Sequence, residues 1–326
     1  MIKYLKENIG YFLFILVIVL LIRIRLPFYI NAPGGIIDIS SRIEYKDKIE
    51  NPGSINLLYV TEYVATIPTY LLSYILPDWD RESIKENQVS STETPEEINI
   101  RNKVLLDNSI NSAMYVAYTA ANKKIKVNNT HNIIIASIAD NGLKIGDEIL
   151  EVNNKKINNV NEIKEKIKNM NIGDKLSFKV LRNNNEINID SKITEEKGQK
   201  VLGVVMMTNY DYEIDPKIKL KFKKSESGSS GGLMMSLSIY NAISGIDILK
   251  GRNIAGTGTI DANGNVGEIA GIKYKIMGAH KNNMDIVLVP SANYEEAIKT
   301  AKSHNYKMKI VKVETFNDAI NYLKNN

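Results

Sequence analysis

The chain has 326 residues, 44% of them hydrophobic and 24% charged, which fits a globular protein large enough for two domains. The net charge of +5 is small and the lysines are scattered, so a nucleic-acid partner is not expected. Because cysteine is absent, disulfides, thiolate nucleophiles and cysteine-based metal sites are excluded, and we expect no metal. The phosphate-binding pattern Gly-x-x-x-x-Gly-Lys-Ser/Thr does not occur either, so we expect no bound nucleotide or other cofactor.

An uncharged, mostly apolar segment lies near the N-terminus, over residues 9–22. Its 14 residues are fewer than the about 20 that a membrane-spanning helix needs. Apolar residues continue as far as Ile30, however, and cations flank the segment on both sides, namely Lys3, Lys6, Arg23 and Arg25. The pattern predicts an uncleaved transmembrane anchor within residues 1–30. A cleaved signal peptide and a buried core helix are the two alternatives.

Residues 31–123 form a mixed segment between this anchor and the next module. β-Branched and aromatic residues predict a strand over 54–61, and a polar stretch predicts an exposed loop over 78–99. Apolar residues at helical spacing then predict an amphipathic helix over 101–121.

A second module begins with a run of β-branched residues that is followed by a glycine-containing turn. Ile133-Ile-Ile-Ala-Ser-Ile leads into Asn141-Gly-Leu-Lys-Ile-Gly-Asp-Glu-Ile, and a helix is predicted from Val160 to Asn169. These blocks resemble a bacterial PDZ domain over residues 124–195. The resemblance implies a β-rich domain in which an extended peptide adds to a sheet edge beside a helix.

By that resemblance the peptide-facing strand lies near Asn132–Ile138. Ile133 and Ile135 are then on the strand, and Ile163 and Ile167 are on the opposing helix. The alternative interpretation is that these isoleucines are core residues. The usual carboxylate-binding loop is not evident before Ile133, which argues against a preference for C-terminal peptides.

The loop Gly228-Ser-Ser-Gly-Gly precedes an apolar helical pattern and contains a candidate nucleophile, Ser230. A serine hydroxyl needs a base, and none of the three histidines lies in a recognisable Ser/His/Asp setting. A lysine can be that base if burial lowers its pKa toward neutrality, and the N–H groups at a helix start favour an oxyanion. The alternative is a glycine-serine loop that only caps an ordinary helix.

Further blocks follow this loop in order. They are Thr257-Gly-Thr-Ile, Gly271-Ile-Lys-Tyr-Lys, Gly278-Ala-His and Val287-Leu-Val-Pro. Together with the loop they resemble the proteolytic domain of the Lon family, the Ser-Lys peptidases, over about residues 201–326. The interval from Thr257 to Lys275 is 18 residues (275 − 257), which is the family's spacing between its threonine and its second lysine.

The resemblance implies that Ser230 is the nucleophile, that Lys275 is its base and that Thr257 orients Lys275 through a hydroxyl hydrogen bond. Lys273, two residues before Lys275, points in a different direction on a helix. The loop residues expected to support the oxyanion are Gly228, Ser229 and Gly231. Two of them depart from the family pattern, because Ser229 replaces a proline and Gly231 an alanine. Ser229 is therefore a minor rival nucleophile.

The expected fold is α+β, with a PDZ domain inserted into a Lon-type domain and an N-terminal transmembrane helix. The expected units are the anchor (1–30), an extracytoplasmic segment packing with the peptidase domain (31–123), the PDZ domain (124–195) and the proteolytic domain (196–326). This order resembles the membrane-anchored PDZ-Lon peptidases of Gram-positive bacteria. It implies an ATP-independent, single-pass serine endopeptidase that cuts unfolded or loosely structured polypeptides outside the cytosol. The alternative is a non-catalytic PDZ scaffold or adaptor with a degenerate Lon-like domain. No feature indicates an oligomeric state.

Overall fold

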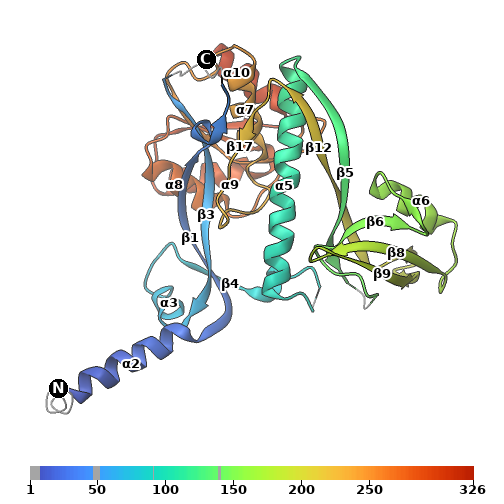
Figure 1. Cartoon of the computed structure of the whole chain (residues 1–326). Helices are drawn as coiled ribbons and strands as arrows, with labels where there is room; N and C mark the ends of the chain where they lie inside the picture. The colour runs from blue at the N-terminus through green and yellow to red at the C-terminus, as the bar shows by residue number, and fades with distance from the viewer. Residues whose placement is uncertain (1–7, 47–51, 91, 139–140) are drawn as a thin grey trace.

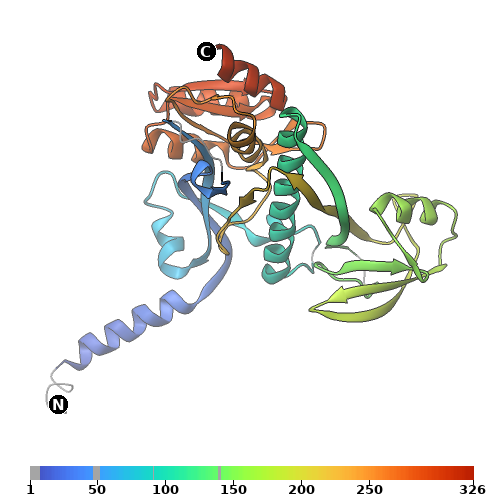
Figure 2. The same cartoon turned by 45° about the horizontal axis from the view of Figure 1, so that its top comes forward.

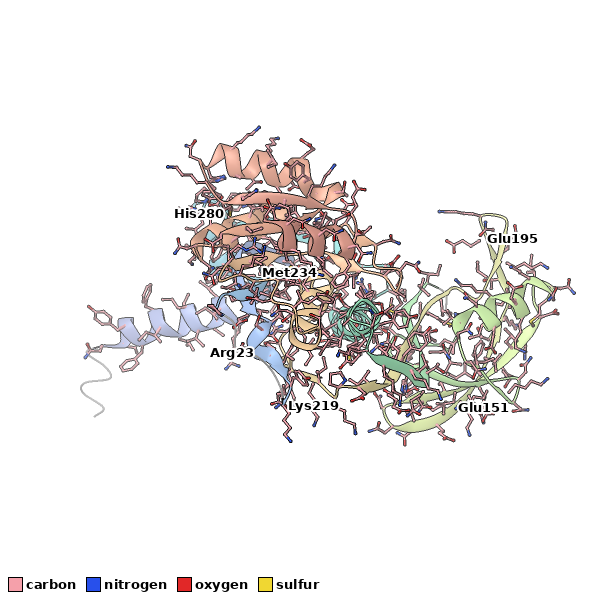
Figure 3. All side chains as sticks on the ribbon, turned by 90° about the horizontal axis from the view of Figure 1, so that it is seen from above. Arg23, Glu151, Glu195, Lys219, Met234 and His280 are labelled. Carbon is pink, nitrogen blue, oxygen red and sulfur yellow. The ribbon has the colours of Figure 1, made fainter. Side chains whose placement is uncertain are left out.

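The computed structural model describes residues 8–46, 52–90, 92–138 and 141–326. A larger body and a smaller β-rich lobe are linked by the long helix α5 and two long strands, β5 and β12 (Figure 1). These elements span Pro95–Ala120, Lys124–Ser137 and Val204–Asp215. Seen from above, Met234 lies inside the body, whereas Glu151 and Glu195 lie in the lobe (Figure 3).

A six-stranded sheet in the order β18-β17-β14-β3-β1-β4 forms the centre of the body. Its strands are β1 (Arg25–Asp38), β3 (Ser54–Thr66), β4 (Asp80–Ser83), β14 (Asn253–Gly256), β17 (Ile286–Pro290) and β18 (Lys309–Val313). β3 pairs in parallel with β14, so strands from the two ends of the chain share one sheet. The segment before the lobe therefore packs with the C-terminal part, and the lobe is an insertion between them.

Helices cover both faces of this sheet. α5, α7 (Gly232–Ile243) and α10 (Phe316–Asn325) contribute to the core on one face, and α8 (Ile272–Lys281) and α9 (Tyr294–Ser303) to the core on the other. Successive strand residues alternate between the two cores, as Leu57 and Leu58 do. The body is thus a three-layer α/β/α arrangement, viewed from a second direction in Figure 2.

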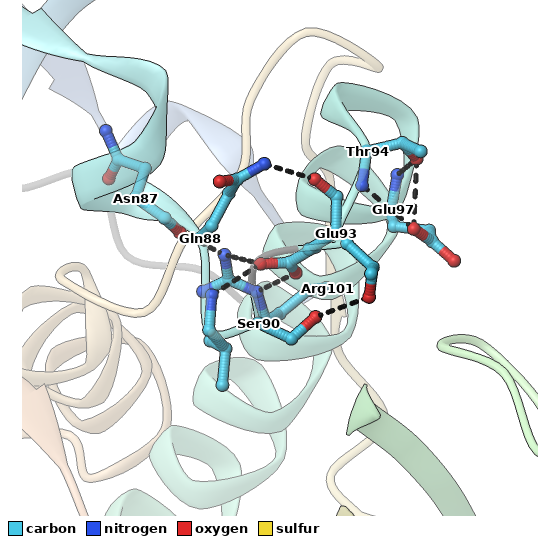
Figure 4. A network of polar contacts seen from close by, with 9 residues as sticks. Asn87, Gln88, Ser90, Glu93, Thr94, Glu97 and Arg101 are labelled. Atoms are coloured by element: carbon cyan, nitrogen blue, oxygen red, sulfur yellow. Dashed lines mark hydrogen bonds and ion pairs between the residues drawn. The ribbon is translucent and has the colours of Figure 1, made fainter. Parts of the chain in front are cut away.

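The start of α5 is fixed by a network of polar contacts (Figure 4). Thr94 caps the helix, because its Oγ1 accepts the N–H of Glu97 while the Glu97 carboxylate accepts the N–H of Thr94. The fully buried Glu93 carboxylate accepts Arg101 Nε at 2.8 Å, which pairs the buried charge. The predicted loop over 78–99 is therefore more ordered than expected, and it also contains β4 and α4 (Ile84–Asn87).

The lobe contains a second sheet in the order β12-β5-β6-β8-β9. Its other elements are β6 (Glu148–Val152), β7 (Lys155–Lys156), α6 (Val160–Lys168), β8 (Lys175–Arg182) and β9 (Asn185–Lys192). Asn183 and Asn184 join β8 to β9 with φ values of 50° and 62°, a pair that suits a tight two-residue hairpin turn. Ile163 and Ile167 of α6 belong to the buried core of the lobe.

Short elements complete the described residues. They are η1 (Ser40–Arg42), β2 (Ile43–Glu44), α3 (Ile67–Leu72), β10 (Thr194–Glu196), β11 (Gln199–Val201), β13 (Lys219–Leu220), β15 (Thr259–Ile260), β16 (Val266–Gly267) and η2 (Ser291–Asn293).

The N-terminal helix α2 covers Ile9–Arg23 and has no buried residue. Its 15 residues extend about 22 Å at 1.5 Å per residue, less than the roughly 30 Å of a bilayer's hydrocarbon core. Among the described residues, no helix combines the length and the apolar character that crossing a membrane requires. The structure therefore does not support the predicted transmembrane helix. Lys3 and Lys6, which were part of that prediction, lie outside the described residues.

Candidate active site

The candidate nucleophile, Ser230, lies in the loop that leads into α7, two residues before the helix begins. Glycine is required at the first helical position, Gly232, because a Cβ there would lie 2.8 Å from the backbone nitrogen of Ile260 and 3.0 Å from Ser109 Oγ. This close approach seats the loop between α5 and β15. Ser230 itself stays partly exposed, as a nucleophile for a large substrate must.

The nucleophile loop is held by hydrogen bonds from two sides. From α5, the Asn102 carbonyl accepts the Gly228 N–H at 2.9 Å, and Ser109 Oγ donates to the Ser229 carbonyl at 3.0 Å. From the segment after β14, the Gly258 N–H donates to the Ser230 carbonyl at 2.8 Å. These bonds fix the peptide group before Gly228 and the peptide groups on both sides of Ser230.

The hydrogen bonds also identify the N–H groups that remain for an oxyanion. The Gly228 N–H was an expected donor, but it already donates to Asn102, so Gly228 is corrected to a loop anchor. The N–H groups of Ser229, Ser230 and Gly231 have no acceptor within the part of the chain that the structure describes. Because they precede the N-terminus of α7, the helix dipole adds to their attraction for negative charge.

The candidate base, Lys275, lies on α8 with only 3% of its surface exposed. Its Nζ donates to Thr257 Oγ1 at 3.0 Å, and Thr257 Oγ1 donates in turn to the Ser230 carbonyl at 3.1 Å. Burial lowers the pKa of Lys275 from its ordinary 10.5 to about 7. Desolvation is the sole cause of this shift, so no neighbouring carboxylate restores the charge.

The neighbouring lysine, Lys273, points elsewhere. Its Nζ forms an ion pair with Asp80 at 3.1 Å, and about a third of its side chain is exposed. The Tyr274 hydroxyl also donates to Asp80, so this carboxylate fixes the outer face of α8. Of the two lysines, only Lys275 is therefore buried beside Thr257 and the nucleophile loop.

Ser230 Oγ has no hydrogen-bond partner among the described residues, so Ser230 and Lys275 are joined through Thr257 rather than directly. The histidines lie elsewhere. His280, on the outer side of the body in Figure 3, stacks on Tyr306 at 3.9 Å, and His304 lies on the same tyrosine. His131 bridges Glu148 and Asp211 in the lobe. No group of three or more metal-ligating side chains gathers in the described ranges.

The structure changes the expected peptide edge of the lobe. β5, which carries Ile133 and Ile135, pairs with β12 along one side and with β6 on the other. The pairing with β6 covers Asn132 and Ile133, and Ile134 forms backbone hydrogen bonds with Gly146 and Asp147. The prediction of a free peptide edge at Ile133 is therefore corrected, while Ile135 stays a prediction. Ile163 and Ile167 belong to the buried core of the lobe, which agrees with the alternative interpretation that these isoleucines are core residues. The strand at this edge of the sheet is β12.

Sequence reasoning missed the contribution of α5 to the nucleophile loop. Ser109 is 120 residues before Ser229, and an isolated serine on an amphipathic helix carries no signal of a catalytic role. Asn102 meets the loop only through its backbone carbonyl, and such a contact leaves no signal in the sequence.

Comparisons with known proteins match two segments of the chain. The family model for the Lon protease C-terminal proteolytic domain matches residues 223–325, and a PDZ model matches residues 112–193. Similar curated proteins include the Lon proteases of Neorickettsia sennetsu (32% identical) and Campylobacter jejuni (35% identical), each over 98 residues. Each match covers 30% of this chain and 12% of the relative, so the chain spans about an eighth of those proteins.

Among solved structures, the PDZ domain of the SdrC-like protein from Listeria monocytogenes is 21% identical, with a TM-score of 0.23. That match covers 25% of this chain and 92% of the other. The fold, the site and the two family matches lead to one conclusion: the chain contains a Lon protease C-terminal proteolytic domain and a PDZ domain.

Proposed function

We propose that the protein is a serine endopeptidase in which Ser230 and Lys275 act as nucleophile and base. The observation that carries the proposal is the buried Lys275, with a pKa of about 7, bound to a threonine that also holds the Ser230 carbonyl. An ordinary structural lysine is exposed or paired with a carboxylate, whereas this one is neither. A neutral amine beside a serine is what Ser-Lys catalysis needs.

In the proposed reaction, neutral Lys275 Nζ accepts the Ser230 proton as Oγ attacks the peptide carbonyl. This step requires Lys275 to turn from Thr257 toward Ser230, a movement consistent with the loose catalytic contacts of substrate-free enzymes. The N–H groups of Ser230 and its neighbours stabilise the oxyanion. Protonated Lys275 then gives its proton to the leaving amine, and water attacks the resulting ester by the same route in reverse.

We further propose that the PDZ domain accepts an extended segment along β12 rather than β5. Val204 and Met206 of β12 pack on the core that contains Ile163 and Ile167, and Thr208 Oγ1 accepts the Val160 N–H at the start of α6. An extended segment that adds to the edge of β12 would thus lie beside α6, which is the arrangement that strand addition to a PDZ domain uses. Substrate segments delivered here would be close to α5 and the nucleophile loop.

The proposed setting is a membrane-attached peptidase of the Gram-positive PDZ-Lon type, with its catalytic domain outside the cytosol and no use of ATP. Two observations support this. The residues of α2 are apolar and exposed on all sides, an arrangement that water disfavours, and these 326 residues contain no phosphate loop. Its substrates would be unfolded or loosely structured polypeptides.

Hydrolysis of casein by the purified full chain in detergent, without nucleotide, tests the proposal against the scaffold alternative. We expect hydrolysis by the wild type and none by Ser230→Ala, with unchanged circular dichroism. Ser229→Ala is the matched control, because it alters the neighbouring serine and should stay active. A wild-type chain that binds casein without cutting it would favour the non-catalytic scaffold.

A further inference from the structure

A small apolar surface lies on α3 and the turn that follows it. The α3 patch consists of Leu71, Leu72, Tyr74 and Ile75, whose exposed fractions are 59%, 44%, 64% and 76%. Contiguous apolar side chains at this exposure indicate a contact surface rather than scattered surface residues.

The patch is held in a defined geometry. Thr66 and Thr69 form a capping box at the start of α3, with Pro68 in the first turn. Behind the patch, the Tyr70 ring lies 5.1 Å from Phe28 of β1 and 5.7 Å from Tyr74. The Arg81 guanidinium lies 3.7 Å from the centre of the Tyr74 ring. The capping box and these ring contacts therefore hold α3 and its exposed apolar side chains in a fixed position.

The patch lies where α2 leaves the body. α2 contacts α3, and both views show the two helices at the same end of the molecule (Figures 1 and 2). None of the residues of α2 is buried, and apolar side chains surround the helix. A helix that is apolar on every side needs an apolar environment, and the lipid at a membrane boundary supplies one. Arg23, at the end of α2, and Arg25, at the start of β1, would meet lipid phosphates.

We propose that the α3 patch is a second membrane-contact surface, which lies in the headgroup–acyl boundary beside a membrane-attached α2. The proposal rests on the proposed membrane attachment. Its occupant is the lipid surface, and the depth is that of interfacial elements, about 5–10 Å below the headgroups. Tyr70, Tyr74 and Arg81 supply the aromatic and cationic groups that favour this boundary.

This contact would fix the orientation of the peptidase. β4 begins at Asp80, five residues after Ile75 at the end of the α3 patch (80 − 75). The Asp80 carboxylate forms an ion pair with Lys273 and accepts the Tyr274 hydroxyl, and both residues are on α8. α8 carries Lys275. An α3 patch bound at the membrane is thus linked through β4 to α8. The distance of the active site from the lipid surface is therefore fixed.

The single tryptophan of the chain, Trp79, reports on this geometry, because it lies between the patch and β4 and packs edge-on against Tyr63. Full-length protein is mixed with vesicles of phosphatidylcholine and phosphatidylglycerol, with bromine at either shallow or deep acyl positions. We expect shallow bromines to quench Trp79 more strongly than deep ones. In Leu71→Glu/Ile75→Glu that quenching should be lost, and vesicle affinity should fall by at least about tenfold.

Ile172→Glu is the matched control, since Ile172 is 54% exposed but lies in the lobe, and its quenching and affinity should equal those of the wild type. Circular dichroism of each variant checks that the fold is retained. Equal quenching in wild type and the double variant, or bound protein without quenching, overturns the proposal. So does a dimer in detergent that the double variant dissociates, because the patch would then cover a second copy. Wild-type protein that does not bind vesicles refutes membrane attachment as well. Casein hydrolysis, which tests the proposed peptidase activity, is measured separately.

Discussion

The body and the lobe differ in what determines the position of their functional surfaces. In the body, the residues assigned from sequence blocks, Ser230, Thr257 and Lys275, lie at one place and are joined by hydrogen bonds. In the lobe, the peptide edge assigned to β5 is already paired on both sides. The difference arises because chemistry depends on residue identity at fixed spacing. A free sheet edge depends instead on strand order, and the strand that pairs with β5 is far away in the sequence. Asn132 of β5 pairs with Thr208 of β12, 76 residues later.

The largest effect expected from this comparison separates the two lysines of α8. Lys275→Ala should lower kcat for casein or a fluorogenic peptide by about 10⁴-fold, because nucleophile and base act as one unit. Lys273→Ala removes an ion pair with Asp80 that is partly exposed, so kcat should stay within about threefold of wild type. An inactive Lys273→Ala with an active Lys275→Ala would show that the base has been assigned to the wrong lysine.

Thr257→Val should have the next largest effect. The change keeps the shape of the side chain but removes the acceptor of Lys275 Nζ and the donor to the Ser230 carbonyl. We expect kcat to fall by roughly 10-fold to 100-fold with little change in KM, since two buried hydrogen bonds are lost and each contributes about 0.5–1.5 kcal/mol. Thr257→Ser, which keeps the hydroxyl, should recover most of the activity. If valine were as active as serine, Thr257 would have no orienting role.

A smaller effect is expected from the contact that sequence reasoning missed. Ser109→Ala removes the hydrogen bond to the Ser229 carbonyl and leaves the loop tied at Gly228 and Ser230. A neutral hydrogen bond contributes about 1 kcal/mol, so kcat should fall by about fivefold to tenfold while the stability of the fold changes little. Ser177→Ala, on β8 in the lobe, is the control serine. An effect on KM alone would place Ser109 in substrate binding instead of loop positioning.

The smallest effect concerns the lobe. Ile133 and Met207 are directly paired between β5 and β12, and cross-strand pairs lie at a separation that a disulfide can span. Because the chain has no cysteine, Ile133→Cys/Met207→Cys provides a clean lock. Oxidation should join the two strands and leave casein hydrolysis within about twofold of the reduced form. Activity that is lost on oxidation and returns on reduction would show that β5 must separate from β12 to admit substrate.

The parts of the molecule that could be predicted are those encoded in local patterns. The helix expected over Val160 to Asn169 is observed over Val160–Lys168, and the helix expected over 101–121 is part of α5. The oxyanion loop shows the limit, since Gly228 fits the pattern of a donor but its N–H is taken by Asn102, a partner that only the tertiary fold provides. The N-terminal segment shows another limit, because hydropathy alone does not set where α2 begins and ends.

The central claim is that Lys275 works as a neutral base, and the pH dependence of kcat/KM tests it most directly. Burial lowers the pKa of Lys275 to about 7, so the neutral, active form predominates above that pH and the protonated, inactive form below it. We therefore predict that kcat/KM rises tenfold per pH unit in mild acid, bends near pH 7 and stays level into the alkaline range, with the same profile in His280→Gln and His304→Gln. A bend near 10, or a bend that disappears with either histidine, would contradict the account.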